Sequence, residues 1–156
     1  MSKAADVPFA TTLHIRERCL CLHVQRAARL VARRFDDALR PLGLTNGQFS
    51  LLNSLNRPQP ARMGPVAALL ALDRTTLTAA LKPLEHGGLV EVAVDPADRR
   101  GRVLTLTRAG RSLLAAAVPL WKRTHAQVEN LLAGADPDLL RRGLRSLAYR
   151  PGSRRD

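Results

Sequence analysis

Apolar residues recur at steps of three and four positions along the first long segment of the chain, from about Thr12 to Leu42. This spacing is typical of one face of an α-helix, and it persists for about six turns. Pro41 and Gly43 mark the end of the segment. Such a long amphipathic helix on a small chain indicates packing against more than its own domain. The apolar positions are Leu20, Val24, Ala27, Ala28, Val31, Phe35, Ala38, Leu39 and Leu42.

Two shorter segments with helical spacing follow. The first begins at Thr45, a possible N-cap, and runs to about residue 56. Two prolines in the stretch 57–62 predict a loop, because proline cannot continue a helix. The stretch 64–72 predicts a short helix with Pro65 in its first turn, where proline is tolerated.

The next segment has the strongest start and stop signals. Asp73 is a good N-cap, and Gly87 and Gly88 end the helix. At about 100 degrees per residue the helix has two faces of different character. The buried side is predicted to hold Leu77, Ala80, Leu81 and Leu84. The exposed side holds Thr75, Thr78, Ala79 and Lys82, with no acidic residue among those four.

Two stretches with alternating apolar and polar residues, "LVEVAV" and "VLTLT", predict an antiparallel pair of strands. Their connection, 95–102, opens with Asp-Pro, a common turn start. This connection contains three arginines within four positions, Arg99, Arg100 and Arg102. A solvated turn does not need so much positive charge.

Two further helices are predicted to complete the chain. The first runs from Thr107 to about Leu132, with a kink expected at Pro119. The second is capped by Asp136 and begins at Pro137. Its apolar stripe consists of Leu140, Leu144 and Leu147.

This order of elements predicts a mainly α fold with a small β-hairpin. Helices followed by a hairpin form a winged helix-turn-helix domain, flanked here by N- and C-terminal helices. In such a domain the second helix of the helix-turn-helix lies in the major groove of DNA. The exposed threonines and Lys82 suit contacts to bases and phosphates. The hairpin arginines suit the narrow minor groove, and Asp98 is expected to hold one of them by ion pairing.

The charge of the chain supports an anionic partner. In 156 residues, 25 Lys and Arg oppose 13 Asp and Glu, which gives a net charge of +12. Nucleic acid, a membrane surface or an acidic protein could balance it. The excess of arginine favours nucleic acid, because its planar group grips phosphates and guanine edges in pairs of hydrogen bonds. Few aromatic residues are present for stacking on single strands, which favours duplex DNA.

The segment "LDRTTLTAALKPLEHGGLVEVAVDPADRRGRVLTLTRAG", 72–110, resembles the core of the MarR (multiple antibiotic resistance regulator) transcription factors. The shared features are the Asp98-Arg99-Arg100 run, the Leu104-Thr105-Leu106-Thr107 run and Gly110. The stretch "LRPLGLTNGQFSLL", 39–52, is similar to the junction of the family's first two helices.

The resemblance implies a single domain over 1–156 that forms a homodimer. Its dimerisation helices would span 12–42 and 108–150, and its winged helix-turn-helix 45–107. The protein would then be a repressor that reads a near-palindromic operator. By the same resemblance, the recognition-helix contacts fall on Arg74, Thr75, Thr76, Thr78 and Lys82, and the wing contact on Arg100.

The resemblance also implies a switch that releases DNA. Members of the family respond to small anionic aromatic compounds or to oxidation of a cysteine. Cys21 falls where the peroxide-sensing members carry their reactive cysteine. The tyrosines of those sensors are replaced here by Gln25, Phe35 and Asn46. Alternatively, Arg16 and His23 could meet a carboxylate ligand beside Trp121.

A metal site is a further alternative. Cys19 and His23 lie at i and i+4, and His125 could approach from another helix. No third cysteine or carboxylate ligand is evident, so no metal or other cofactor is expected. If the two cysteines lie on one helix, their side chains diverge by about 200 degrees and should not form a disulfide bridge.

Other functional classes lack sequence support. The chain has no glycine-rich phosphate loop, paired-carboxylate site or nucleophile elbow, so an enzyme is not expected. It has no apolar run near the ~18 residues of a membrane span and no signal-peptide core. A cytoplasmic location without membrane attachment is therefore expected. A basic helical adaptor without DNA specificity remains the alternative from another class.

Overall fold

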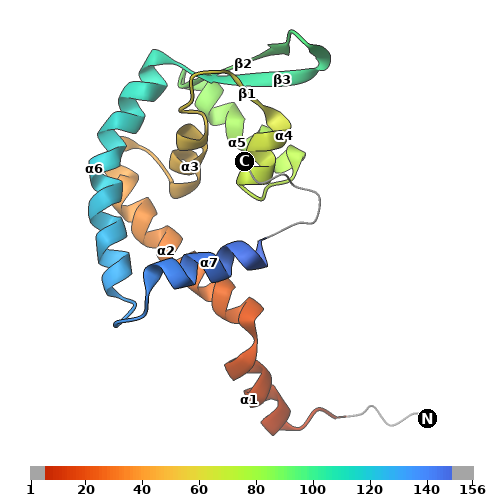
Figure 1. The fold of residues 1–156 in the computed structure, drawn as a ribbon, viewed down its shortest axis with the longest axis vertical. Helices are drawn as coiled ribbons and strands as arrows, with labels where there is room; N and C mark the ends of the chain where they lie inside the picture. Colours follow the sequence, from red (N-terminus) through yellow and green to blue (C-terminus); the bar gives the residue numbers. More distant parts are fainter. Residues whose placement is uncertain (1–5, 149–156) are drawn as a thin grey trace, which may run out of the picture.

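The computed structural model describes residues 6–148, which form seven α-helices, a short 3-10 helix and a three-stranded sheet (Figure 1). The mainly α winged helix-turn-helix class predicted from the sequence is confirmed. The elements in chain order are α1 (Phe9–Arg18), α2 (Leu20–Leu39), the 3-10 helix η1 (Arg40–Leu42), α3 (Asn46–Ser54), β1 (Ala61–Arg62), α4 (Met63–Leu69), α5 (Arg74–His86), β2 (Val90–Asp95), β3 (Asp98–Leu106), α6 (Arg108–Asn130) and α7 (Pro137–Leu147).

A continuous apolar core joins α3, α4 and α5 to the sheet and to the first half of α6. The strand order is β1-β3-β2 with antiparallel pairing, and Val92 pairs with Leu104. Alternate residues of the strands face the core, which follows from the period of two in their sequence. The least exposed large side chains are Leu39, Leu51, Leu52, Leu55, Leu77, Leu84, Val90 and Leu104.

Start signals in the sequence correctly located three of the helices, α3, α5 and α7. Thr45 caps α3 and forms a capping box with Gln48, in which each side chain bonds the other's backbone N–H. Asp73 caps α5, and Asp136 caps α7 with Pro137 at the first helical position. Helix α6 continues as one element through Pro119.

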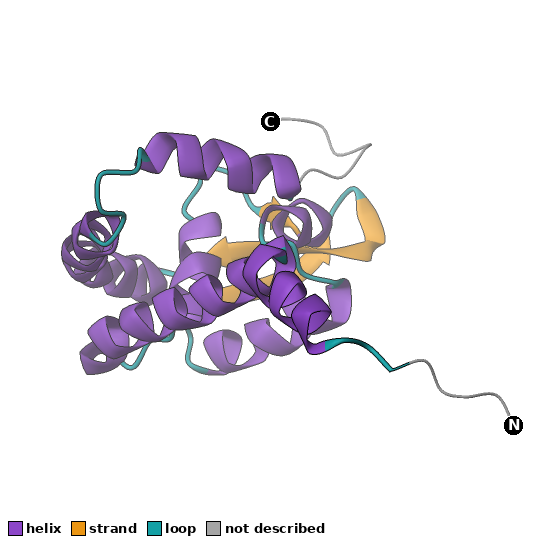
Figure 2. Cartoon of the chain, turned by 90° about the horizontal axis from the view of Figure 1, so that it is seen from below, coloured by secondary structure: helices purple, strands orange, loops and turns teal. Residues whose placement is uncertain are grey.

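The terminal helices are arranged differently. Helix α2 packs along α6, whereas α1 extends away from the rest of the protomer (Figure 1). In the view turned by 90° from Figure 1, α7, the last helix before the C-terminus, runs along one side of the molecule (Figure 2). Neither α1 nor α7 contains a buried residue.

No helix within residues 6–148 has the length and apolar composition needed to cross a membrane.

The prediction of a single helix over Thr12–Leu42 is wrong. The helix breaks at Cys19, whose backbone is extended (φ −69°, ψ 104°), and it ends in the 3-10 turn η1. The Cys19 Sγ accepts a hydrogen bond from the Leu22 backbone N–H at 3.5 Å, in the place of a hydroxyl N-cap. Cys19 and Cys21 therefore do not share one helix, and the sequence argument against a bridge between them loses its premise.

The hairpin also differs from the prediction. The strands extend to Asp95 and Asp98, so only Pro96 and Ala97 form the turn, and the arginines lie on β3 rather than in a loop. The register shifts by a bulge between Val94 and Asp95. The predicted loop 57–62 likewise ends in a strand, because β1 pairs with β3.

Candidate nucleic-acid interface

Helix α5 has the two faces that its sequence predicts. Leu77, Leu81 and Leu84 are buried, and Ala80 is half-buried. The other side is open to solvent over its whole length. Its exposed residues are Arg74, Thr75, Thr76, Thr78, Ala79 and Lys82.

The first turn of α5 is fixed by Asp73. One carboxylate oxygen accepts the Thr76 backbone N–H at 2.7 Å, and the other accepts the Thr76 hydroxyl at 2.8 Å. These hydrogen bonds, the backbone one first, hold the pKa of Asp73 below its usual value of 3.8. The Thr76 hydroxyl donates within the cap, and the Thr78 hydroxyl donates to the Arg74 carbonyl at 2.8 Å. Both hydroxyls keep lone pairs that can accept a hydrogen bond from a ligand.

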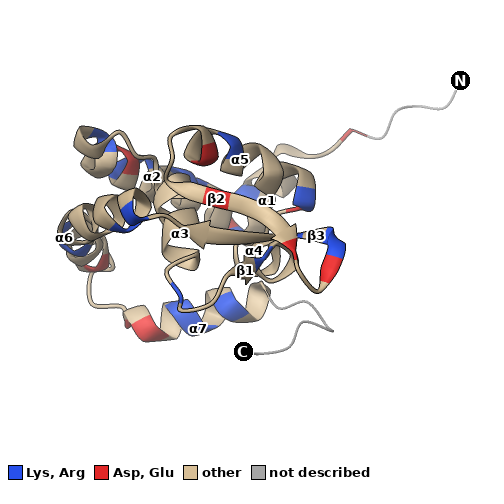
Figure 3. Cartoon of the chain, turned by 90° about the horizontal axis from the view of Figure 1, so that it is seen from above, with Lys and Arg blue, Asp and Glu red and all other residues tan. Residues whose placement is uncertain are grey.

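The wing is formed by β2 and β3, and Arg99, Arg100 and Arg102 are exposed on β3. Figure 3 shows basic and acidic segments side by side at its tip. Asp98 accepts the backbone N–H of Arg100 at 3.0 Å. The prediction that Asp98 pairs with an arginine side chain is wrong for the protomer described, in which Asp98 forms no ion pair within residues 6–148.

The ion pair at the wing instead involves a residue that the sequence did not indicate. The Arg62 Nε lies 2.8 Å from Oδ2 of Asp95, whose side chain is only 6% exposed. A hollow of about 280 Å³ lies between the wing and the start of α5. It is lined by, among others, Arg62, Arg74, Asp95, Asp98 and Arg102. Arginines from three elements thus surround one surface depression.

The candidate switch residues lie on the terminal helices. Cys21 is exposed on α2, and its Sγ accepts a hydrogen bond from Gln25 Nε2 at 3.1 Å. Cys19 is half-buried at the helix break, and its carbonyl lies 2.9 Å from Nδ1 of His23. Arg16 is exposed on α1. Within residues 6–148, no three His, Cys, Asp or Glu residues come together as a metal site would require.

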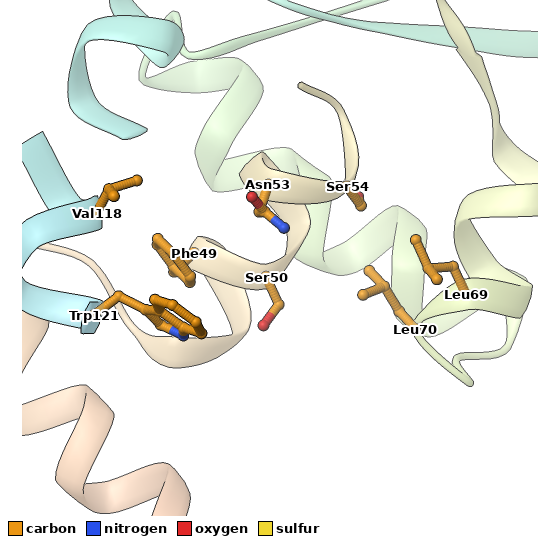
Figure 4. Close-up of a pocket in the computed structure, with 8 residues that line it drawn as sticks. All are labelled: Phe49, Ser50, Asn53, Ser54, Leu69, Leu70, Val118 and Trp121. Carbon is orange, nitrogen blue, oxygen red and sulfur yellow. The ribbon is translucent and has the colours of Figure 1, made fainter. Parts of the chain in front are cut away.

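A second, mainly apolar hollow of about 440 Å³ lies between α3, α4 and α6 (Figure 4). Its aromatic wall is formed by Phe49 and Trp121, whose ring centroids are 6.4 Å apart. Trp121 also stacks on His125 at 4.7 Å. Arg16 and His23 are not among the residues that line this hollow in the described part of the chain.

Comparison with known proteins identifies the family. The model of the MarR family matches residues 44–101. The Mycobacterium tuberculosis transcriptional regulator MosR, solved in complex with DNA, is 38% identical with a TM-score of 0.74, over 84% of this chain and 94% of that chain. The chain belongs to the MarR family.

Two other members of the MarR family illustrate its range. CouR of Rhodococcus jostii RHA1, solved with p-coumaroyl-CoA, is 25% identical with a TM-score of 0.73, over 88% of this chain and 97% of that chain. The transcriptional activatory protein BadR of Rhodopseudomonas palustris is 33% identical over 95 residues. That match covers 59% of this chain and spans about half, 54%, of BadR. These relatives are regulators of transcription rather than enzymes.

Proposed function

We propose that this MarR-family chain is a dimeric regulator of transcription that binds double-stranded DNA and releases it when a small molecule binds. The observation that carries the proposal is that one hollow is lined both by Arg74, which begins the exposed face of α5, and by Arg102 on the wing strand β3. A duplex that receives α5 in its major groove meets the wing at the adjacent minor groove. The relative MosR, which shares this fold, has been solved with DNA.

Each exposed residue of this interface has a role in the proposal. Thr75, Thr78 and Lys82 contact base edges or phosphates in the major groove. Arg74 and Thr76 lie near the sugar-phosphate backbone of the DNA. Arg99, Arg100 and Arg102 place positive charge in the narrow minor groove, where the potential is most negative. Regulation is by repression, which requires only that the bound dimer occlude a promoter.

The dimer is proposed to form through the terminal helices, 12–42 and 108–150, around the winged domain 45–107. Residues 149 and 150 lie outside the described part of the chain. Support comes from large apolar side chains on the terminal helices that remain 42–73% exposed. They include Phe9, Ile15, Leu20, Leu30, Leu139, Leu140, Leu144 and Leu147. Such surface is rarely left open in a soluble monomer.

Selection of bound duplexes from a random DNA pool tests this proposal directly. The expected product is a near-palindrome with half-sites about one helical turn apart. On that site Arg100→Ala should weaken binding by about 1–3 kcal/mol. Thr78→Ala should relax base preference more than it weakens non-specific binding. If the selection enriches no sequence, a basic adaptor without DNA specificity becomes the better description of the protein.

The hollow beside Trp121 is the proposed effector site. Its apolar, partly aromatic lining suits a small aromatic acid, and the relative CouR was solved with p-coumaroyl-CoA. Trp121 is the only tryptophan in the sequence, so its fluorescence reports on this hollow alone. Titration with a panel of hydroxylated aromatic acids should quench Trp121 emission and release DNA at the same ligand concentration. Release without quenching would place the effector elsewhere.

Oxidation of Cys21 is a second candidate switch. The observation that favours it is the exposed thiol with the Gln25 amide 3.1 Å from Sγ, which can also bond an oxidised sulfur. A stoichiometric amount of cumene hydroperoxide should then release DNA from the wild type and leave Cys21→Ser bound. An equal response of both proteins would remove Cys21 as a sensor.

A further inference from the structure

The Arg62–Asp95 pair lies at the base of the wing and ties together two segments that are distant in sequence. Arg62 ends β1, immediately before α4, and Asp95 ends β2 at the bulge. Both carboxylate oxygens of Asp95 are engaged. Oδ1 accepts the Ala97 backbone N–H at 2.9 Å, and Oδ2 lies 2.8 Å from Arg62 Nε.

This pairing leaves most of the Arg62 guanidinium available. The group has five N–H bonds, and Nε supplies one of them. Within residues 6–148 the two Nη groups of Arg62 form no other ion pair or hydrogen bond. The Arg62 side chain is 61% exposed, in contrast to the buried Asp95. One edge of the guanidinium is therefore anchored, and the other faces solvent.

Arg62 lines the hollow that Arg74 and Arg102 also line. Arg74 begins α5, and Arg102 lies on β3, so the hollow separates the proposed major-groove element from the proposed minor-groove element. The sugar-phosphate strand between two adjacent grooves must cross this surface. Three guanidinium groups and the carboxylates of Asp95 and Asp98 leave the hollow with a net charge of +1.

We propose that this hollow seats one phosphate of the strand between the two grooves, with Arg62 as the residue that grips it. Asp95 is a positioning residue that holds the Arg62 guanidinium with its Nη edge outward. A planar guanidinium binds phosphate through two parallel hydrogen bonds, which a fixed orientation favours. The inference rests on the proposed function, and it adds a contact that carries affinity without base preference.

The test measures duplex affinity as a function of salt for Arg62→Ala on a selected site and on a random duplex. Loss of one phosphate contact in each protomer should weaken binding to both duplexes by a similar factor at low salt, about tenfold per contact and about a hundredfold for the dimer. Because the dimer loses two phosphate contacts, the slope of log K against log salt should also become shallower by about 1.8. Arg57→Ala is the matched control, because it removes the same charge from an exposed position in the loop after α3, outside the proposed dimerisation helices and the proposed DNA contacts.

Asp95→Asn separates gripping from positioning. The substitution removes a negative charge beside the phosphate, so simple electrostatics predicts tighter binding. We expect weaker binding instead, with the wild-type salt slope retained, because Arg62 keeps its charge and loses its orientation. Unfolding temperatures of both variants within a few degrees of the wild type would show that the winged domain remains folded.

Two results would overturn the inference while leaving the proposed function intact. One is an Arg62→Ala variant that binds both duplexes with wild-type affinity and slope. The other is an Arg62→Ala variant that loses affinity only for the selected site and keeps the wild-type salt slope. In that case Arg62 would hold the wing in position without contacting a phosphate. A wild-type protein that binds neither duplex would instead refute the proposed function, and the inference with it.

Discussion

The winged domain and the terminal helices differ in how their apolar side chains are buried. In the winged domain the apolar stripes of α3, α5 and the sheet meet one another, and Leu77 is completely buried. In α7 the stripe of Leu140, Leu144 and Leu147 remains exposed. The first region buries its apolar residues within one protomer, and the second is the region that we propose a partner protomer covers. The difference separates residues that stabilise the fold from residues that we propose stabilise the dimer.

Polar contacts show the same contrast. Helix α7 is held to α6 by Arg141, whose Nη1 lies 2.6 Å from Glu129 Oε1. The same guanidinium pairs with Asp138 in the first turn of α7. Pairs at this level of exposure contribute little stability. They link α7 to α6 while its apolar face stays exposed, as the proposed dimer requires.

Leu77→Ala should have the largest effect. The side chain is fully buried in the core, so its truncation leaves a cavity and lowers the free energy of unfolding by about 2–5 kcal/mol. Urea denaturation at one protein concentration measures the loss. The same truncation at Leu69, which is 71% exposed, is the control and should cost less than about 0.5 kcal/mol. Equal losses at the two positions would contradict the placement of the core.

Gly110→Ala should have the next largest effect. A Cβ at this position would lie 2.2 Å from the Leu89 carbonyl oxygen, so the start of α6 must move away from β2. We expect a loss of about 3 kcal/mol in unfolding free energy. Gly143 in α7 is the matched control, because a Cβ there meets nothing within 4 Å. Gly143→Ala should be neutral or stabilise the helix by about 0.5–1 kcal/mol, and a large loss there would mean that α7 is closely covered in the dimer.

Leu144→Asp should leave the protomer folded and weaken the assembly. A charge in the α7 stripe would be buried against the partner, so the dimer dissociation constant should rise at least about tenfold, or 1.4 kcal/mol. Analytical ultracentrifugation over a range of concentrations measures this shift, and circular dichroism checks the helix content. Ser146→Asp, on the same helix but outside the stripe, is the charge-matched control. An unshifted dissociation constant would exclude α7 from the interface.

The same contrast explains which features could be predicted from sequence. The caps Thr45 and Asp73 and the faces of α5 depend on neighbours within one or two turns, which periodicity records. The Arg62–Asp95 pair joins residues 33 positions apart, so no local pattern reveals it. The break at Cys19 has neither proline nor glycine, and a thiol is an unusual cap. The short wing turn was missed because polar arginines on exposed strands look like a loop.

The smallest effect is expected from the N-caps, which again differ between the two regions. Asp73 makes two hydrogen bonds to Thr76 at the start of α5, and Asp136 makes one, to the Asp138 backbone, at the start of α7. Asp73→Ala should therefore lower both the unfolding temperature and DNA affinity slightly, whereas Asp136→Ala should leave DNA affinity unchanged. Binding and melting measurements on the two variants test this. If α5 needed no cap, Asp73→Ala would keep its DNA affinity, as Asp136→Ala is expected to do.

The lowered pKa of Asp73 adds a direction in pH to this last prediction. A carboxyl whose pKa is depressed in the folded state stabilises that state above its unfolded pKa, near 3.8, and loses the contribution as the pH falls through the folded value. Asp73→Asn keeps a cap but removes the charge. Wild type should therefore melt at a higher temperature than Asp73→Asn at neutral pH, and the difference should shrink only below about pH 4. A difference that persists unchanged in acid would mean that the Asp73 charge contributes nothing, and that the geometry of the cap alone fixes the first turn of α5.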